Sequence, residues 1–213
     1  MLNLLRQTSV IPDNRLVSDK VNILGVGAIG SQLTNQIARS GMLRATLWDF
    51  DQVESHNIPN QAFAQSDVGR NKAQAMQEIV QRDTGLKYAT RSKYEGEPLS
   101  GIVFSCVDNM DVRKEILDNM TGGIFIEVRM GVYHGQVYSV RHGDEEAREF
   151  WDSRWVGDEV IEEKSACGTS LTIGATAQFL SSIAAWQAFH YMREEPTPKC
   201  ITMCVNPFHL MEE

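Results

Sequence analysis

Three glycines stand where a short apolar run gives way to a helical pattern, and this junction limits the possible folds more than any other feature of the chain. Residues 20–25 have the composition of a buried strand, and residues 31–40 have the apolar spacing of a helix. The glycines at the junction are Gly25, Gly27 and Gly30. Glycine permits a tight strand-to-helix turn and lets a phosphate group approach the backbone N–H groups at the helix N-terminus. The junction therefore predicts an α/β fold with a phosphate-binding loop.

An acidic residue follows the loop at the distance expected of a ribose ligand. Residues 44–50 form a second predicted strand, and Asp49, 19 residues beyond Gly30, lies at its end. A carboxylate in that place can accept hydrogen bonds from ribose hydroxyls. A glycine pattern alone is also compatible with a purely structural turn, and together with Asp49 it does not distinguish NAD from ATP. The combination of strand, loop, helix and acid favours a nucleotide site.

The rest of the chain continues the alternation of strands and helices. Further strands are predicted at 87–92, 101–107, 124–128 and 135–140, and further helices at 68–83 and 111–120. A β-α-β-α order over the first 120 residues predicts a mostly parallel, Rossmann-like sheet with helices on both faces. Residues 199–210 are expected to form a last strand, in a C-terminal antiparallel extension.

We expect a single domain over residues 1–213, with residues 1–20 as an N-terminal extension. Residues 141–166 are expected to form a crossover loop over the surface, with some helix, because they are rich in acidic residues and lack clear periodicity. Residues 171–192 read as a helix that is apolar almost all round and rich in small side chains. Such a helix needs partners on all sides, so it is predicted to be buried or to lie at a subunit interface.

Composition excludes several classes of function. A formal net charge of −8 argues against a protein that binds the nucleic-acid backbone, which requires a basic face. No apolar stretch approaches membrane-spanning length, and the first 20 residues lack the apolar core of a signal peptide. The four cysteines are too few and scattered for a disulfide scaffold, and Cys200 and Cys204, a C-x-x-x-C without a second pair, give only weak support for structural zinc. We expect a cytoplasmic protein with reduced thiols that binds neither nucleic acid nor a membrane.

Three blocks of polar residues follow the glycine loop in order. They read Asp49-Phe-Asp51-Gln-Val-Glu-Ser-His-Asn57-Ile-Pro-Asn60-Gln61, then Asp67-Val-Gly69-Arg-Asn-Lys72-Ala, then Asp108-Asn109 with Arg113. They resemble the ThiF/MoeB/HesA-like adenylyltransferases, relatives of ubiquitin-activating enzyme, which carry D-x-D-x-V-x-x-x-N-L-x-R-Q, D-x-G-x-x-K-A and D-N-x-x-x-R blocks at similar spacing. The resemblance is strong over residues 21–113 and less close over 167–192.

The resemblance implies a site for ATP and Mg²⁺. The implied nucleotide ligands are Gly25, Gly27, Gly30, Asp49, Asp51, Asn57, Gln61, Lys72, Asp108 and Asn109. Among them Asp49 resembles the ribose ligand, Asn57 and Lys72 the groups on the phosphates, and Asp108 the aspartate that holds Mg²⁺. Attack of a carboxylate on the α-phosphate brings anions together, so Lys72 and a metal ion at Asp108 would have catalytic roles in offsetting the developing charge.

The same residues also have structural interpretations, which are alternatives to these roles. Lys72 is equally typical of a solvated helix lysine, and Asp108 with Asn109 of an N-cap pair for the helix that follows. Asn60 occupies the place where the family has an arginine, and loss of an arginine from phosphates is commonly worth orders of magnitude in rate. Arg6 with Gln7 resembles an R-Q element that reaches the partner subunit's site in the family, although an exposed tail has the same appearance.

Cys167 precedes the last long helix, where the family places its reactive cysteine in a C-x-T-x-G sequence. A thiolate at a helix N-terminus has a lowered pKa, which suits a nucleophile. A buried structural cysteine is the alternative. Cys106, inside an apolar strand, is expected in the core.

The resulting prediction is an enzyme that adenylates the C-terminal carboxylate of a ubiquitin-like protein or peptide. Cys167 would then capture the acyl group as a thioester or persulfide-linked intermediate. By resemblance, the protein is expected to be a homodimer that pairs through the helix at 171–192. A non-catalytic partner subunit or scaffold is the first alternative, supported by Asn60. An NAD-dependent oxidoreductase is the second, supported only by the glycine loop.

Overall fold

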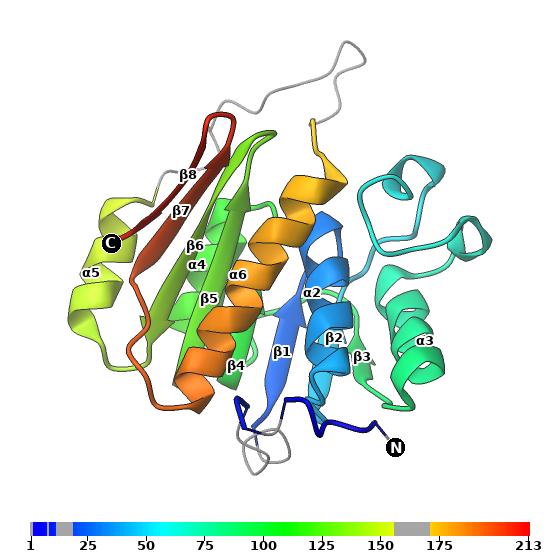
Figure 1. The fold of residues 1–213 in the computed structure, drawn as a ribbon, viewed down its shortest axis with the longest axis horizontal. Helices are drawn as coiled ribbons and strands as arrows, with labels where there is room; N and C mark the ends of the chain where they lie inside the picture. Colours follow the sequence, from blue (N-terminus) through cyan, green and yellow to red (C-terminus); the bar gives the residue numbers. More distant parts are fainter. Residues whose placement is uncertain (1, 8, 12–18, 156–170) are drawn as a thin grey trace.

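The computed structural model describes residues 2–7, 9–11, 19–155 and 171–213, and one eight-stranded sheet runs through it (Figure 1). The strand order is β3-β2-β1-β4-β5-β6-β7-β8. The first five strands in sequence pair in parallel: β1 (Val21–Leu24), β2 (Ala45–Trp48), β3 (Ala89–Arg91), β4 (Leu99–Ser105) and β5 (Met120–Met130). The last three add in antiparallel fashion: β6 (His134–Arg141), β7 (Cys200–Val205) and β8 (Phe208–Glu212). The predicted fold class is confirmed.

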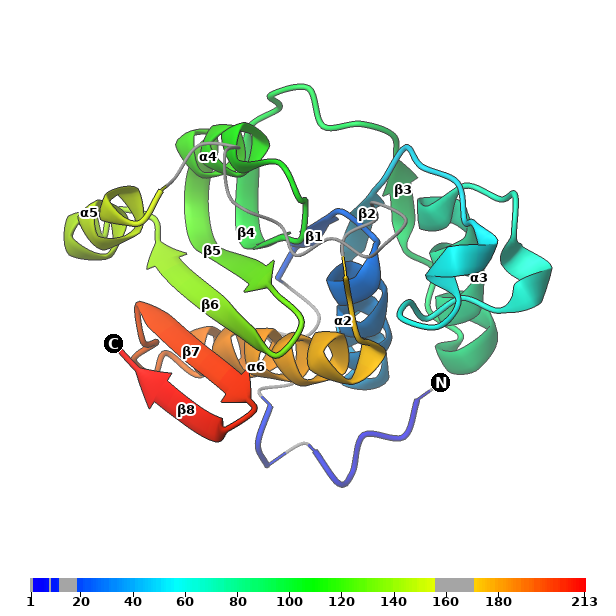
Figure 2. The same ribbon diagram turned by 90° about the horizontal axis from the view of Figure 1, so that it is seen from above.

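Helices cover both faces of the sheet, as Figure 2 shows from above. One face carries α2 (Ala28–Arg39), α3 (Lys72–Thr84) and α6 (Gly174–Met192), and the other carries α4 (Met110–Asp118) and α5 (Glu145–Ser153). Two single-turn 3₁₀ helices, Ser55–Asn57 and Gln65–Asp67, lie between β2 and α3. No described helix is long and apolar enough to cross a membrane.

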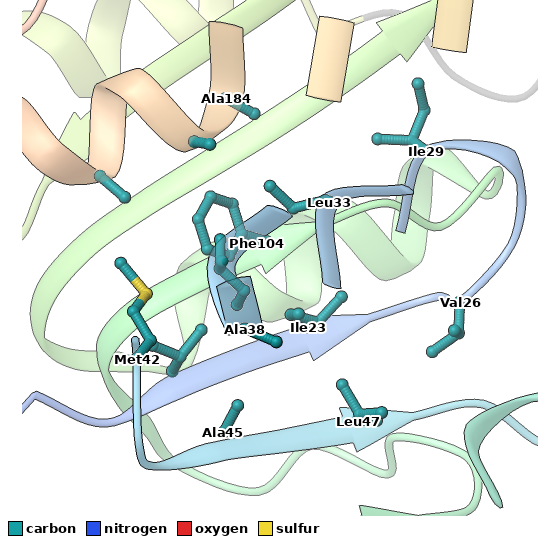
Figure 3. Packing of buried hydrophobic residues seen from close by; sticks show 14 of the residues in the cluster. Ile23, Val26, Ile29, Leu33, Ala38, Met42, Ala45, Leu47, Phe104 and Ala184 are labelled. Carbon is teal, nitrogen blue, oxygen red and sulfur yellow. The ribbon is translucent and has the colours of Figure 1, made fainter. Parts of the chain in front are cut away.

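Each face of the sheet has its own buried cluster. The larger cluster lies under α2, α3 and α6, and its members include Ile23, Leu33, Phe104 and Ala184 (Figure 3). The smaller cluster lies under α4 and α5 and contains Phe125 and Trp151, both fully buried. Because β1 and β4 contribute side chains to both clusters, they are buried on both faces, as a doubly covered parallel sheet requires.

Three elements differ from the sequence prediction. Helix α3 begins at Lys72 rather than at 68, because the Asn71 side chain caps it by accepting the backbone N–H of Gln74 at 3.1 Å. The acidic segment after β6 contains some helix, α5, as expected, but it is not wholly a surface segment, because Trp151 of α5 is fully buried. Residues 199–210 form parts of two strands, since the chain turns at Asn206 and returns as β8.

Candidate nucleotide site

The glycine loop leaves the sheet where the strand order reverses. Strand β1 has β2 on one side and β4 on the other, so the chain crosses the sheet in opposite directions from this strand. Such a switch point leaves a crevice outside the carboxyl ends of the strands, where ligands of open α/β sheets bind. The residues that follow β1, β2 and β4 here are Gly25, Asp49 and Cys106.

Close backbone contacts require two of the three glycines. Gly25 has a φ of +87°, and a Cβ on it would lie 2.7 Å from the carbonyl oxygen of Cys106. A Cβ on Gly30 would lie 1.9 Å from the carbonyl oxygen of Gly25. Gly27 is the N-cap of α2, and among the described residues no side chain caps the helix there and no atom lies within 4 Å of the place of the missing Cβ of Gly27. The first N–H groups of α2 are therefore approachable by an anion such as a phosphate.

Asp49 braces the glycine loop from the end of the neighbouring strand. Its Oδ2 accepts the backbone N–H of Val26 at 2.7 Å, and its Oδ1 accepts that of Asp51 at 2.8 Å. Burial raises the pKa of this carboxyl group above its ordinary value, although the two backbone hydrogen bonds act in the opposite direction. An ionised carboxylate offers about four lone-pair directions, so both oxygens retain capacity for ribose hydroxyls.

Lys72 is not a solvated helix lysine. Its side chain is only 11% exposed, and its Nζ lies 2.9 Å from Oδ2 of the exposed Asp51. The neighbouring Asn71 donates from Nδ2 to the carbonyl oxygens of Asp49 at 3.0 Å and Asp51 at 3.2 Å. Hydrogen bonds of Asn71 thus attach the second motif block to the end of β2. The buried ammonium group of Lys72 is held beside Asp49, the carboxylate that braces the glycine loop.

The segment that carries Asn60, in the place of the family's arginine, packs against the start of α6. Asn57 is buried, and its Oδ1 accepts the backbone N–H of Glu54 at 2.9 Å. Asn60 donates from Nδ2 to the hydroxyl oxygen of Thr172, two residues before α6. The carbonyl oxygens of the Asn60 and Gln61 side chains are buried and have no hydrogen-bond partner. Asn60 therefore has a structural contact, while its own Oδ1 and Oε1 of Gln61 remain unsatisfied.

Asp108 and Asn109 follow β4, and both are exposed. Asn109 caps α4 by accepting the backbone N–H of Val112 at 2.8 Å, as the structural interpretation predicted for this residue. Among the described residues, no group of three His, Cys, Asp or Glu side chains is arranged to hold a metal ion. A Mg²⁺ ion at Asp108 would need phosphate oxygens and water as its other ligands, which is how this ion is usually bound beside nucleotides. The open helix N-terminus, the buried Lys72 and the exposed Asp108 are chemically suited to ATP and Mg²⁺.

A buried carboxylate that the sequence analysis missed lies beside this loop. Glu127 is 0% exposed on β5, in register with Ser105 at the end of β4. Its Oε1 lies 2.6 Å from Nη1 of Arg113 and 2.6 Å from Nε of Arg129, and the indole N–H of Trp151 donates to its Oε2. Burial opposes ionisation, but the two guanidinium groups hold the pKa of Glu127 below its ordinary value. A glutamate inside the apolar run of β5 was the signal for this cluster.

Of the two cysteines that precede the last long helix, the structure describes Cys106 but not Cys167. Cys106 is partly buried and packs against the larger cluster, and burial raises the pKa of its thiol to about 12, which disfavours a nucleophilic thiolate. Cys167 and residues 156–166 of the predicted crossover lie in the segment 156–170, outside the described ranges. Arg6 is exposed.

Comparisons with known proteins agree with the motifs. Residues 4–84 match the family model of the ThiF family. Ubiquitin-like modifier-activating enzyme 5 of Branchiostoma floridae is 25% identical over 208 residues, which cover 83% of this chain and 51% of the relative. The same enzyme of Drosophila erecta is 25% identical over 212 residues, covering 83% and 52%. The chain spans about half the length of these curated relatives.

Solved structures share the fold at lower identity. E. coli MccB in complex with N-formylated MccA has a TM-score of 0.75 at 16% identity, covering 94% of this chain and 65% of MccB. MccB with ATP has a TM-score of 0.71 at 17% identity, covering 94% and 64%. A protein named PaaA has a TM-score of 0.72 at 19% identity, covering 99% and 70%. The resemblance carried by the motif blocks is confirmed by the match of residues 4–84 to the ThiF family model, and the solved structures confirm the fold.

Proposed function

We propose that this protein binds ATP and adenylates the C-terminal carboxylate of a ubiquitin-like protein or peptide. The observation that carries the proposal is the assembly at the switch point: a glycine loop braced by Asp49, with the buried ammonium of Lys72 beside it. The names of the relatives support the substrate class, since one group activates ubiquitin-like modifiers and MccB was crystallised with MccA.

The reaction needs a site that gathers anions. A carboxylate oxygen of the substrate attacks the α-phosphorus, the bond to the bridging oxygen of the β-phosphate breaks, and pyrophosphate leaves with that electron pair. The N–H groups at the start of α2 are suited to hold phosphate oxygens, and Lys72 is suited to offset their charge. Mg²⁺ bound by Asp108 would supply further positive charge to the phosphates. Asp49 keeps the loop in shape and is proposed as the ribose ligand.

Asp51 competes with ATP for Lys72. The two side chains form an ion pair, so phosphates that bind Lys72 would have to share it with Asp51 or displace Asp51. The same exposed carboxylate could instead serve a metal ion once Lys72 has turned to the phosphates. ATP binding is therefore expected to weaken the pair between Asp51 and Lys72.

A non-catalytic partner subunit or scaffold is the second candidate function. The family's arginine is Asn60 here, and its amide contacts Thr172. Fewer cations are then present for the phosphates, which would slow adenylation or prevent it.

Several finer features belong to the same proposal. The capture of the acyl group by Cys167, as a thioester with release of AMP, rests on the sequence alone. Homodimerisation through α6 is supported by its two large exposed side chains, Phe179 and Trp186, which are 38% and 47% exposed. A cytoplasmic location likewise rests on the sequence alone.

Pyrophosphate exchange into ATP tests the proposal. The full chain is incubated with Mg-ATP, labelled pyrophosphate and candidate proteins or peptides with free C-termini, and the Asp108→Ala variant is measured beside it. Exchange that requires both the carboxylate and Asp108 supports adenylation. ATP binding without pyrophosphate exchange for any candidate would favour the non-catalytic scaffold. Tighter binding of NAD than of ATP, measured by calorimetry, would contradict both the adenylating enzyme and the scaffold.

A further inference from the structure

Three metal-ligating side chains form a row across the antiparallel extension. His134 on β6 lies directly opposite Cys204 on β7, and Cys204 lies directly opposite His209 on β8. Residues directly opposite in antiparallel strands point to the same face of the sheet, and their Cβ atoms are about 4.5–5.5 Å apart. The row therefore presents two imidazoles on either side of one thiol.

The adjacent row identifies the face. Gly135, Met203 and Leu210 are paired in the same way, and a Cβ on Gly135 would lie 2.4 Å from a methyl group of Leu180 on α6. That row faces α6, so the row of His134, Cys204 and His209 faces away from it. His134 and His209 are exposed, and Cys204 is partly exposed. The row is thus open to solvent at the hairpin end of the extension.

We propose that His134, Cys204 and His209 bind a borderline-soft divalent metal ion of the zinc class. Two imidazole nitrogens and a thiolate are ligands that Zn²⁺ prefers, with bonds of about 2.0–2.3 Å, and three protein ligands leave a fourth position for water. Side chains that leave neighbouring strands about 5 Å apart can converge on one such ion. Binding would join β6, β7 and β8 through their side chains.

The side chains are not yet gathered around a common point. No three ligating groups in the described chain already form a metal site, and the His134 ring lies over Gly131, with its Cε1 2.6 Å from the place of that glycine's missing Cβ. The ring must turn from the β5 side toward Cys204. The two histidine rings are exposed, so their rotamers are free to change. The Cys204 thiol has one weak contact, to the carbonyl oxygen of Asn206 at 3.5 Å.

The second cysteine of the C-x-x-x-C pair is not a ligand. Cys200 lies on the same face but beside Tyr138 at the other end of β7, and it is fully buried. Burial raises the pKa of its thiol, which disfavours the thiolate that a metal requires. The structure therefore separates two cysteines that the sequence spacing suggested as a pair.

Metal titration of the full-length chain tests the site. Reduced, metal-free protein is titrated with Zn²⁺ by calorimetry and with Co²⁺ by absorbance, in parallel with Cys204→Ser, His209→Gln and His134→Gln. Zn²⁺ should bind at one equivalent, Co²⁺ should give a thiolate-to-cobalt charge-transfer band, and Cys204→Ser should lose the band and weaken binding at least tenfold. The control variants Cys200→Ser and His142→Gln should bind as the parent does.

Each outcome decides the proposal, and none depends on nucleotide activity. Absence of stoichiometric binding, a cobalt spectrum without the thiolate band, or unchanged binding in Cys204→Ser would overturn it. Serine is close in size to cysteine, so Cys204→Ser is expected to fold, and its far-ultraviolet circular dichroism checks this. If that variant unfolds, the band and affinity of the two histidine variants carry the decision, since both side chains are exposed.

Discussion

The parallel half of the sheet and its antiparallel extension are held together in different ways. In the parallel half, β1 is buried on both faces, and side chains such as Asp49 and Asn71 fasten loops to backbone atoms of other elements. In the extension, all five residues of β8 are exposed, and this edge strand pairs only with β7 (Figure 1). Tight polar contacts coincide with the motif blocks, while the outermost strand of the extension, β8, is held chiefly by its pairing with β7.

Glu127 lies on the boundary between the two regions. It belongs to β5, the last parallel strand, and it joins Arg113 of α4 to Trp151 of α5. Helix α4 begins at the loop that carries Asp108, whereas α5 packs on β6. One buried carboxylate therefore connects the nucleotide side of the molecule to the extension.

The largest effect is expected from Glu127→Gln. Removing this charge leaves the buried Arg113 without its counterion, and breaking a buried ion pair costs about 3–5 kcal/mol. Urea denaturation followed by fluorescence should show this loss. The exposed Glu149→Gln on α5 is the control and should change stability by less than about 0.5 kcal/mol. A small loss in Glu127→Gln would mean that the two regions are not joined at this carboxylate.

The pH dependence of stability sharpens the same prediction. The pKa of Glu127 in the folded protein lies below its ordinary value of 4.5, so folding favours the ionised form. Its contribution is complete above pH 4.5 and is lost as the pH falls through the lower folded value. Stability of the parent protein should decline along this acid limb, and Glu127→Gln should lack this component of the decline.

Lys72→Met tests whether the contacts of the parallel half serve chemistry. Removal of one preorganised electrostatic group typically lowers the rate about 10²–10³-fold, so pyrophosphate exchange should fall by that order. Stability should change little, because the partner Asp51 is exposed and remains solvated. Lys114→Met, which removes an exposed helix lysine paired with Asp118, is the matched control and should leave exchange unchanged. Equal exchange in both variants would contradict the role of Lys72.

Asp49→Ala should weaken ATP binding by about 1–3 kcal/mol, the cost of removing a charged hydrogen-bond acceptor. Part of the loss would come from the loop itself, since the N–H of Val26 loses its partner. Calorimetry with ATP measures the total. Calorimetry with inorganic pyrophosphate separates the two contributions. Loss of the ribose contact alone would leave the affinity for pyrophosphate unchanged, whereas distortion of the loop would weaken it. An unchanged ATP affinity would remove Asp49 from the site.

The sequence predicted the parallel half better than the extension. Glycine turns and apolar runs are local signals, so β1, α2 and the position of Asp49 could be placed from them. The role of Asn71 as the cap of α3 and the burial of Lys72 depend on β2 and could not. Trp151 lies in an acidic segment, and its burial is decided by Phe125 on another element. The hairpin of β7 and β8 was missed because neither short strand shows a clear alternation of apolar residues and β8 is exposed throughout.

The smallest effect is expected from Leu210→Ala on β8, and it tests the comparison most directly. Leu210 is 48% exposed, whereas Leu47 on β2 is fully buried in the larger cluster. Leu47→Ala should cost about 2–5 kcal/mol through lost burial and a cavity, while Leu210→Ala should cost less than about 0.5 kcal/mol. Thermal denaturation of both variants at two protein concentrations gives the two values. If Leu210→Ala costs as much as a core truncation, and does so only at the higher concentration, then a second copy covers β8 in solution. The difference between the two regions would then be a property of the isolated chain alone.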